Sequence, residues 1–265
     1  MSAAMENFDI IVPALIAGFL VLLSHVPLGQ QVLARGIVFI DLAVAQVAGL
    51  GVIAAHTFGL GEDGWSTQIA AVFAALLGAL LLTWTERKRP EAQEALIGIL
   101  FVLASTAQIL ILANDPHGGE DLKELLAGQI LWVSSTQLWH AAIVTAVFLL
   151  VWFGARERIG RIGFYVLFAL VVTVSVQAVG VYLVFTTLIV PAVATYRYAP
   201  SRQLLVGYAL AAASYALGLV ISLVTDLPAS SMIVWVMAVL GLFVHLASGA
   251  GAGMQSPPRS RNLES

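Results

Sequence analysis

The chain contains no cysteine, and charged residues make up only 10% of its 265 positions. Without cysteine it has no disulfide, no thiolate metal ligand and no cysteine nucleophile. Soluble domains carry about 25% charged residues, so this low charge excludes an ordinary soluble fold. The net charge of −3 is too small to indicate nucleic acid as a partner.

Several catalytic and targeting patterns are also missing. The sequence has no Gly-x-x-x-x-Gly-Lys-Ser/Thr loop, no Gly-x-Ser-x-Gly elbow and no His-Glu-x-x-His helix. We therefore expect a protein that is not an enzyme and cannot itself hydrolyse ATP. The first residues, MSAAMENFD, are acidic and lack the positive region of a cleavable signal peptide. We expect the first apolar run to be retained as a span.

Apolar sequence is what the chain has in abundance, with 60% hydrophobic residues and a mean hydropathy of +0.96. Repeated apolar runs of about 20 residues are typical of a polytopic helical membrane protein. We predict an all-α bundle with eight spans at residues 9–29, 36–58, 67–85, 93–113, 136–153, 162–182, 203–225 and 229–248. The expected organisation is one transmembrane domain over residues 1–250 and a disordered tail over 251–265.

The charges of the loops alternate in sign along the chain. The basic loops hold Arg35; Arg87, Lys88 and Arg89; Arg156, Arg158 and Arg161; and Arg197 and Arg202. The acidic loops hold Glu62, Asp63, Asp115, Glu120, Asp121, Glu124 and Asp226. The positive-inside rule makes the basic loops cytoplasmic. This predicts an N-terminus outside the cytoplasm and a cytoplasmic tail.

The stretch Gln177–Arg197 is apolar almost throughout, yet it is too long for one ordinary span. It has Gly180 near its start, Pro191 near its end, and a Tyr-Arg-Tyr exit. Such an interruption is tolerated inside a bilayer only where protein or a cavity covers the freed backbone groups. The charge alternation is satisfied if a re-entrant helix at about 183–198 follows the sixth span. This pattern predicts a transporter rather than a simple anchor.

Five blocks of sequence, in order over most of residues 10–246, together point to a family. They are Pro27-Leu28-Gly29, Glu94–Phe101, Asp121–Ser134, Gln177–Arg197 and Asp226-Leu227-Pro228. The ordered set resembles the permease subunits of metal-cation ABC importers of the zinc/manganese type. The resemblance implies a multi-pass permease of the bacterial inner membrane that imports a divalent metal. Zinc is the expected cargo, with manganese or iron as alternatives, and no cofactor is expected to be bound permanently.

The resemblance also implies partners. A separate cytoplasmic ABC ATPase would drive transport, and an extracytoplasmic metal-binding protein would deliver the metal. We expect a homodimer, because an ATPase pair has two docking clefts and one chain offers one coupling helix. In this class the re-entrant helix ends in that coupling helix, here Pro191–Tyr198, with Pro191, Thr195, Tyr196 and Arg197 as the coupling residues. Proline suits the first turn of a helix; the alternative is that Pro191 kinks a longer span.

The second span departs from the family pattern. Members usually carry an Asp and a His one helical turn apart there, as in GDALSHAVLPG, whereas this chain reads DLAVAQVAGLG. Leu42 stands in place of the Asp and Gln46 in place of the His, and glutamine is a poorer transition-metal ligand than imidazole. Asp41 is an ionisable residue within an apolar segment, which usually faces a cavity or a partner. A cap near the membrane surface is its alternative role.

Asp41, Gln46 and His25 are the candidate residues of the metal path. The first two lie about 140° apart on a regular helix, so they cannot easily hold one ion from one chain. Either His25 of the first span completes a composite site, or the path has no tight site. His25 as a buried structural histidine is the simpler alternative. We expect the outer loop 114–121 to be a solvated turn; the alternative is that its His117, Asp115, Glu120 and Asp121 attract cations or contact a binding protein.

Two other classes remain open at this point. A secondary transporter driven by an ion gradient also uses broken helices, but usually shows two matching interruptions in repeated halves. This sequence has one clear interruption. The other class is a membrane subunit with no transport role of its own, which the altered second span leaves possible.

Overall fold

A computed structural model describes residues 2–59, 64–113, 115–155, 158 and 160–252, and its regular elements are all helices. Among these described residues, eight helices are long and apolar enough to cross a membrane. They are α1 (Ser2–Arg35), α2 (Ile40–Thr57), α3 (Gly64–Lys88), α4 (Gln93–Leu112), α6 (Ser135–Ala155), α7 (Gly160–Val179), α9 (Pro200–Thr225) and α10 (Ala229–Ala252). The prediction of an all-α, eight-span bundle is confirmed.

Shorter helices complete the described part of the chain. They are η1 (Pro90–Ala92), α5 (Gly118–Ala127), η2 (Ile130–Trp132) and α8 (Val181–Thr195). The formation of α5 corrects the expectation of a plain solvated turn at 114–121, because the first four residues of this helix, 118–121, fall in that range. Of the predicted tail, Gly251 and Ala252 are the last residues of α10, and residues 253–265 lie outside the described residues.

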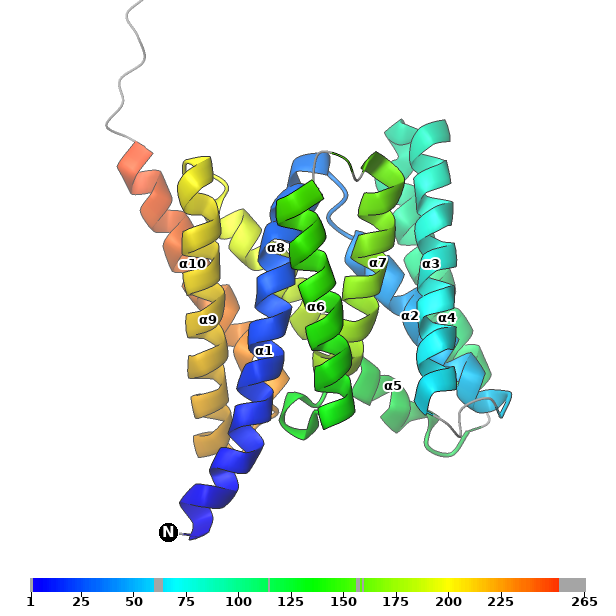
Figure 1. The fold of residues 1–265 in the computed structure, drawn as a ribbon, viewed down its shortest axis with the longest axis horizontal. Helices are drawn as coiled ribbons and strands as arrows, with labels where there is room; N and C mark the ends of the chain where they lie inside the picture. Colours follow the sequence, from blue (N-terminus) through cyan, green and yellow to red (C-terminus); the bar gives the residue numbers. More distant parts are fainter. Residues whose placement is uncertain (1, 60–63, 114, 156–157, 159, 253–265) are drawn as a thin grey trace, which may run out of the picture.

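The long helices run side by side and place the described parts of the basic loops and of the acidic loops at opposite ends (Figure 1). At the basic end, Arg161 lies 3.5 Å from the Glu86 carboxylate, and the Arg35 guanidinium lies 4.0 Å from the centroid of the Phe164 ring. These contacts tie the ends of α1 and α3 to the start of α7. The acidic end, where α5 lies, is at the bottom of Figure 1. We use these two names for the ends below.

Burial separates the central helices from the outer ones. The apolar window of α7 is 72% buried, against 17% for α4 and 22% for α6. Helix α8 is also buried along most of its length and packs against α1, α9 and α10. Such close approach requires small side chains, and a Cβ at Gly29 of α1 would collide with the carbonyl oxygen of Leu188. Helices α7 and α8 therefore form the core of the bundle.

The predicted interruption lies at Gly180, between α7 and α8. Gly180 has φ 87° and ψ 159°, a backbone region that is essentially restricted to glycine. The adjacent segment contributes a second such residue, Gly128, with φ 69° and ψ 166°. A Cβ on Gly180 would collide with the backbone nitrogen of Gly128, and a Cβ on Gly128 with the carbonyl of Val179. The break is thus covered by backbone from the end of α5.

Helix α8 is the predicted re-entrant helix, but its limits differ from the prediction. It has 15 residues, about 22 Å, which is less than the roughly 30 Å of a bilayer core. Pro191 lies inside α8, not at the start of a separate helix as expected for Pro191–Tyr198. The helix continues through Pro191 because neighbouring helices enclose it. The predicted coupling residues therefore comprise the last turns of α8 and the residues that follow.

Candidate functional site

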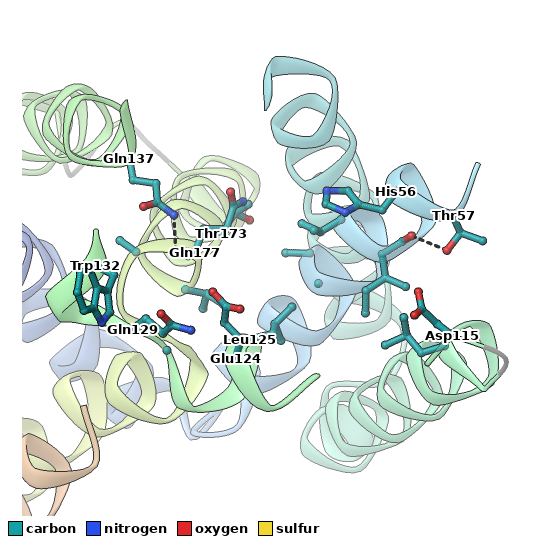
Figure 2. Close-up of a pocket in the computed structure, with 18 residues that line it drawn as sticks. His56, Thr57, Asp115, Glu124, Leu125, Gln129, Trp132, Gln137, Thr173 and Gln177 are labelled. Atoms are coloured by element: carbon teal, nitrogen blue, oxygen red, sulfur yellow. Dashed lines mark hydrogen bonds between the residues drawn. The ribbon is translucent and has the colours of Figure 1, made fainter. Parts of the chain in front are cut away.

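A pocket of about 500 Å³ lies at the acidic end, among α2, α5 and α7. Its walls are apolar residues, mainly of α2 and α7, together with polar side chains from α2, α5, α6, α7 and the loops on either side of α5. The polar ones are His56, Thr57, Asp115, Glu124, Gln129, Gln137, Thr173 and Gln177. Figure 2 shows Thr173 and Gln177 of α7 on one side of the pocket and His56 of α2 on the other.

The rim of the pocket carries charged side chains, whereas its deep part is lined by neutral ones. His56, Asp115 and Glu124 are exposed, whereas Thr173 is fully buried. Two carboxylates against one imidazole make the entrance negative at neutral pH. Such a rim raises the local concentration of cations.

One glutamine at the pocket is held rigidly. Gln137 accepts a hydrogen bond from the Ser134 N–H (2.8 Å) and donates its amide to the Gln177 backbone carbonyl (2.9 Å), as Figure 2 shows for the second bond. It thereby fixes the start of α6 to the end of α7. In contrast, the Thr173 hydroxyl and the Gln177 side-chain nitrogen have no hydrogen-bond partner among the described residues.

A pair of buried glutamines lies next to the pocket. The Gln108 side-chain amide of α4 donates to the Gln46 backbone carbonyl (2.7 Å) and to the Gln46 side-chain oxygen (2.9 Å). Gly49, which lines the pocket, is so close that a Cβ there would be 3.4 Å from the Gln108 nitrogen. Gln46, at the family's histidine position, therefore links α2 to α4 through its hydrogen bonds with Gln108.

This pair gives a stability prediction. Gln108→Leu leaves the buried Gln46 amide without its partner, and we expect a loss of about 1–3 kcal/mol. The double variant Gln46→Leu/Gln108→Leu removes both polar groups and should recover part of that loss. Thermal unfolding of the detergent-solubilised protein measures both effects. Equal destabilisation by the single and double variants would mean that the pair is not coupled.

Asp41 is in the first turn of α2, where the helix dipole favours a negative charge. It is nevertheless only 1% exposed, and its Oδ1 atom has no hydrogen-bond partner among the described residues. Asp41 and the pocket-lining Ala48 are seven residues apart, so they lie within about 20° on the helix and about 10 Å along it. Asp41 thus lies on the same face of α2 as Ala48, between the pocket and the basic end.

His25 lies in α1 and is fully buried. Its Nδ1 atom is 2.9 Å from the Val21 carbonyl and 3.0 Å from the Ser24 hydroxyl, so its described contacts are with its own helix. No hydrogen bond joins His25, Asp41 and Gln46 in the described part of the chain. The described part of the chain also contains no group of three or more His, Cys, Asp or Glu that could hold a metal. The composite site and the path without a tight site, the two alternatives that the sequence leaves open, both stay predictions.

The predicted coupling residues divide into a buried and an exposed pair. Pro191 and Thr195 are buried, and the Thr195 hydroxyl donates to the Pro191 carbonyl (2.7 Å). Tyr196 is 51% exposed, stacks on His245 of α10 with ring centroids 5.7 Å apart, and accepts a hydrogen bond from Arg197 (2.9 Å). Only Tyr196 and Arg197 of these four present a surface at the basic end.

Sequence reasoning missed the pocket itself. In the sequence, Gln177 and Gln108 are single polar residues within apolar spans, and His56 is one of five scattered histidines. Polar residues in spans often simply bridge helices, as Gln108 does. The remaining lining residues come from segments distant in sequence, so no local spacing marks them.

Comparison with known proteins gives matches over nearly the whole chain. A family model described as "ABC 3 transport family" matches residues 7–160 and 154–248. The zinc uptake membrane protein ZnuB of Haemophilus influenzae is 25% identical, over 86% of this chain and 93% of that protein. The manganese transport membrane protein MntC of Halalkalibacterium halodurans is 25% identical, over 72% of this chain and 70% of that protein.

A solved structure shares the fold. It is described as PsaBC from Streptococcus pneumoniae in complex with Fab, and its matching chain has a TM-score of 0.74 and 24% identity. The match covers 92% of this chain and 95% of that one. The arrangement of helices described above is therefore shared with that protein.

Proposed function

The chain belongs to the ABC 3 transport family, and from this premise we propose that it is the membrane permease of an ABC importer for divalent metal ions. The observation that carries the proposal is the pocket with an acidic rim at one end of a multi-pass bundle. A negative entrance suits a cationic cargo. The similarity to ZnuB and MntC supports zinc as the first cargo to test, with manganese next and iron as an alternative.

The proposal includes the partners and the location. The sequence has no phosphate-binding loop, so the ATPase is a separate cytoplasmic subunit. A metal-binding protein would deliver the ion to the acidic end, which the positive-inside rule places outside the cytoplasm. The permease would act as a homodimer in the bacterial inner membrane. The exposed Tyr196 and Arg197 at the basic end would contact the ATPase.

The test is metal uptake by cells that carry the permease, its ATPase and its binding protein. We expect accumulation of radioactive zinc or manganese that requires a catalytically intact ATPase. Uptake that continues without the ATPase and stops when an ionophore dissipates ion gradients would instead favour a secondary transporter. A permease deletion with no effect on the accumulation of any divalent metal would favour a subunit without a transport role.

We further propose that the ion leaves the pocket past Asp41. Asp41→Asn keeps the size of this buried side chain but removes its charge, so we expect uptake to fall at least about tenfold. Membrane insertion should be unchanged. Asp226→Asn is the matched control, because Asp226 lies at the acidic end outside the pocket lining and its φ of 56° is one that asparagine tolerates. Normal uptake by Asp41→Asn would remove Asp41 from the path.

His25 and Gln46 remain tentative path residues that the same assay can test. If His25 acts with Asp41 in another conformation, the two alanine variants should each abolish uptake and together do no further harm. If the metal path has no tight binding site, His25→Ala and Gln46→Ala should leave metal uptake nearly unchanged, apart from their effects on packing.

A further inference from the structure

The end of α8 at the basic end of the bundle is held by a histidine of another helix. His245 of α10 is half-buried, and its ring stacks on the Tyr196 ring with centroids 5.7 Å apart and 23° between the ring planes. Its Nδ1 atom lies 3.3 Å from the Val193 carbonyl oxygen. A carbonyl oxygen only accepts hydrogen bonds, so Nδ1 carries the hydrogen. His245 thus contacts the end of α8 through both its ring face and its N–H group.

Both contacts match what the end of a helix requires. The last four carbonyl groups of a helix have no partner within the helix, and Val193 lies two residues before the last residue of α8. A histidine N–H is a suitable donor to such a carbonyl. Aromatic rings attract each other at centroid separations of about 4.5–7 Å. His245 therefore caps the end of α8 and orients the first residue after it, Tyr196.

The backbone of α10 brings His245 to this position. A Cβ on Gly241 would collide with the Val190 side chain of α8, so the two helices approach each other closely there. His245 is four residues further along α10 and lies on the same face of that helix. The close approach at Gly241 thus sets the distance at which the imidazole meets the end of α8.

The Tyr196 ring in turn holds the exposed Arg197. The Arg197 Nε atom donates to the Tyr196 hydroxyl oxygen (2.9 Å), and the guanidinium carbon lies 5.4 Å from the centre of the Tyr196 ring. The Gln203 amide of α9 donates to the Tyr196 carbonyl oxygen (3.2 Å) and holds the backbone of this residue, whereas the stack on His245 holds its ring. A side chain that is ordered before a partner binds loses less conformational entropy on binding. The contacts therefore run from His245 through Tyr196 to Arg197.

We propose that His245 is a positioning residue for coupling to the ATPase: through the Tyr196 ring, it orders Arg197 in the orientation that the ATPase binds. The inference rests on the proposed function, in which Tyr196 and Arg197 contact the ATPase. It adds a residue of α10, a helix that contains none of the coupling residues predicted from the sequence. Loss of this order should weaken association with the ATPase about 3- to 10-fold.

The first experiment measures the affinity of the purified ATPase for the permease in nanodiscs. His245→Ala removes the ring and its N–H and should weaken binding about 3- to 10-fold, whereas His245→Phe keeps a ring and should bind more nearly like the wild type. Leu246→Ala is the matched control, because Leu246 is the next residue of α10 and is 60% exposed; it should bind normally. Wild-type affinity of His245→Ala, or equal weakening by the alanine and phenylalanine variants, would overturn the proposal.

The second experiment separates positioning from a purely structural role. If His245 acts through the Tyr196 ring, His245→Ala should change the affinity by less than about twofold once Tyr196→Ala has removed that ring. Losses that multiply in the double variant would contradict the proposal. Thermal unfolding in detergent is measured for each variant, because a residue that only stabilises the bundle would lower the melting temperature without changing the affinity of the folded permease.

Metal uptake by the complete transporter keeps this inference distinct from the proposed function. ATPase-dependent uptake of zinc or manganese by the wild type, together with normal ATPase binding by His245→Ala, would reject the inference and leave the proposed function intact. Wild-type uptake that does not require the ATPase would reject the proposed function itself.

Discussion

Gly180→Ala is expected to abolish accumulation of the folded permease. Its backbone dihedral angles, φ 87° and ψ 159°, lie in a region that alanine avoids. The added methyl group would also collide with the backbone of Gly128, which cannot move aside as a flexible side chain would. We expect a destabilisation of more than about 3 kcal/mol. Size-exclusion chromatography and thermal unfolding in detergent measure it.

Gly154→Ala is the matched control for this substitution. Gly154 lies in α6, and a Cβ there would meet nothing within 4 Å. Alanine is a better helix former than glycine by about 1 kcal/mol, so this variant should be as stable as the wild type or slightly more so. If Gly180→Ala behaves like Gly154→Ala, the packing of Gly180 against Gly128 is not what fixes the break between α7 and α8.

Arg197→Glu is expected to reduce association with the ATPase at least about tenfold while membrane insertion stays normal. Arg197 is exposed at the basic end and bonds to the exposed Tyr196, whereas the preceding Thr195 is buried. Reversal of its charge removes both this bond and any ion pair with an acidic partner surface. Co-purification of the tagged permease with the ATPase measures the effect.

Arg87→Glu supplies the same change of charge at the same end of the bundle. Arg87 is exposed near the end of α3, outside α8 and the residues that follow it. This control should retain the ATPase. Equal retention by both variants would exclude Arg197 from the coupling surface, and equal loss by both would point to the overall charge of the basic end.

Much of the fold could be predicted from local sequence. Apolar runs of about 20 residues allow little except a membrane helix, so eight spans were found with limits close to those of the structure. Family membership was also predicted from the ordered blocks, of which Gln177–Arg197 carried the most weight. The start of the re-entrant helix was predicted at about residue 183, whereas α8 begins at Val181, directly after Gly180. The sequence did not reveal that Gly128 packs on Gly180.

The candidate site could be predicted only in part. Asp41 was identified because a carboxylate within an apolar segment is unusual. That Gln46 pairs with Gln108 of α4 could not be derived, since many polar residues on other spans were equally plausible partners. His25 was chosen to complete a metal site, but its described contacts are within α1. The pocket residues Thr173 and Gln177 were not selected, because single polar residues in spans usually have structural roles.

The sequence by itself determined that this protein is a multi-pass helical bundle whose loops alternate between basic and acidic, and that it contains no Gly-x-x-x-x-Gly-Lys-Ser/Thr loop. These properties depend on composition and on short motifs, which act through local hydrophobicity and charge. Only the tertiary structure decided which helices are central, where the α7–α8 break is covered, and which polar groups meet in the pocket at the acidic end. Those features depend on contacts between residues far apart in the chain, such as Gly128 with Gly180 and Gln46 with Gln108, and hydrophobicity does not encode such pairings.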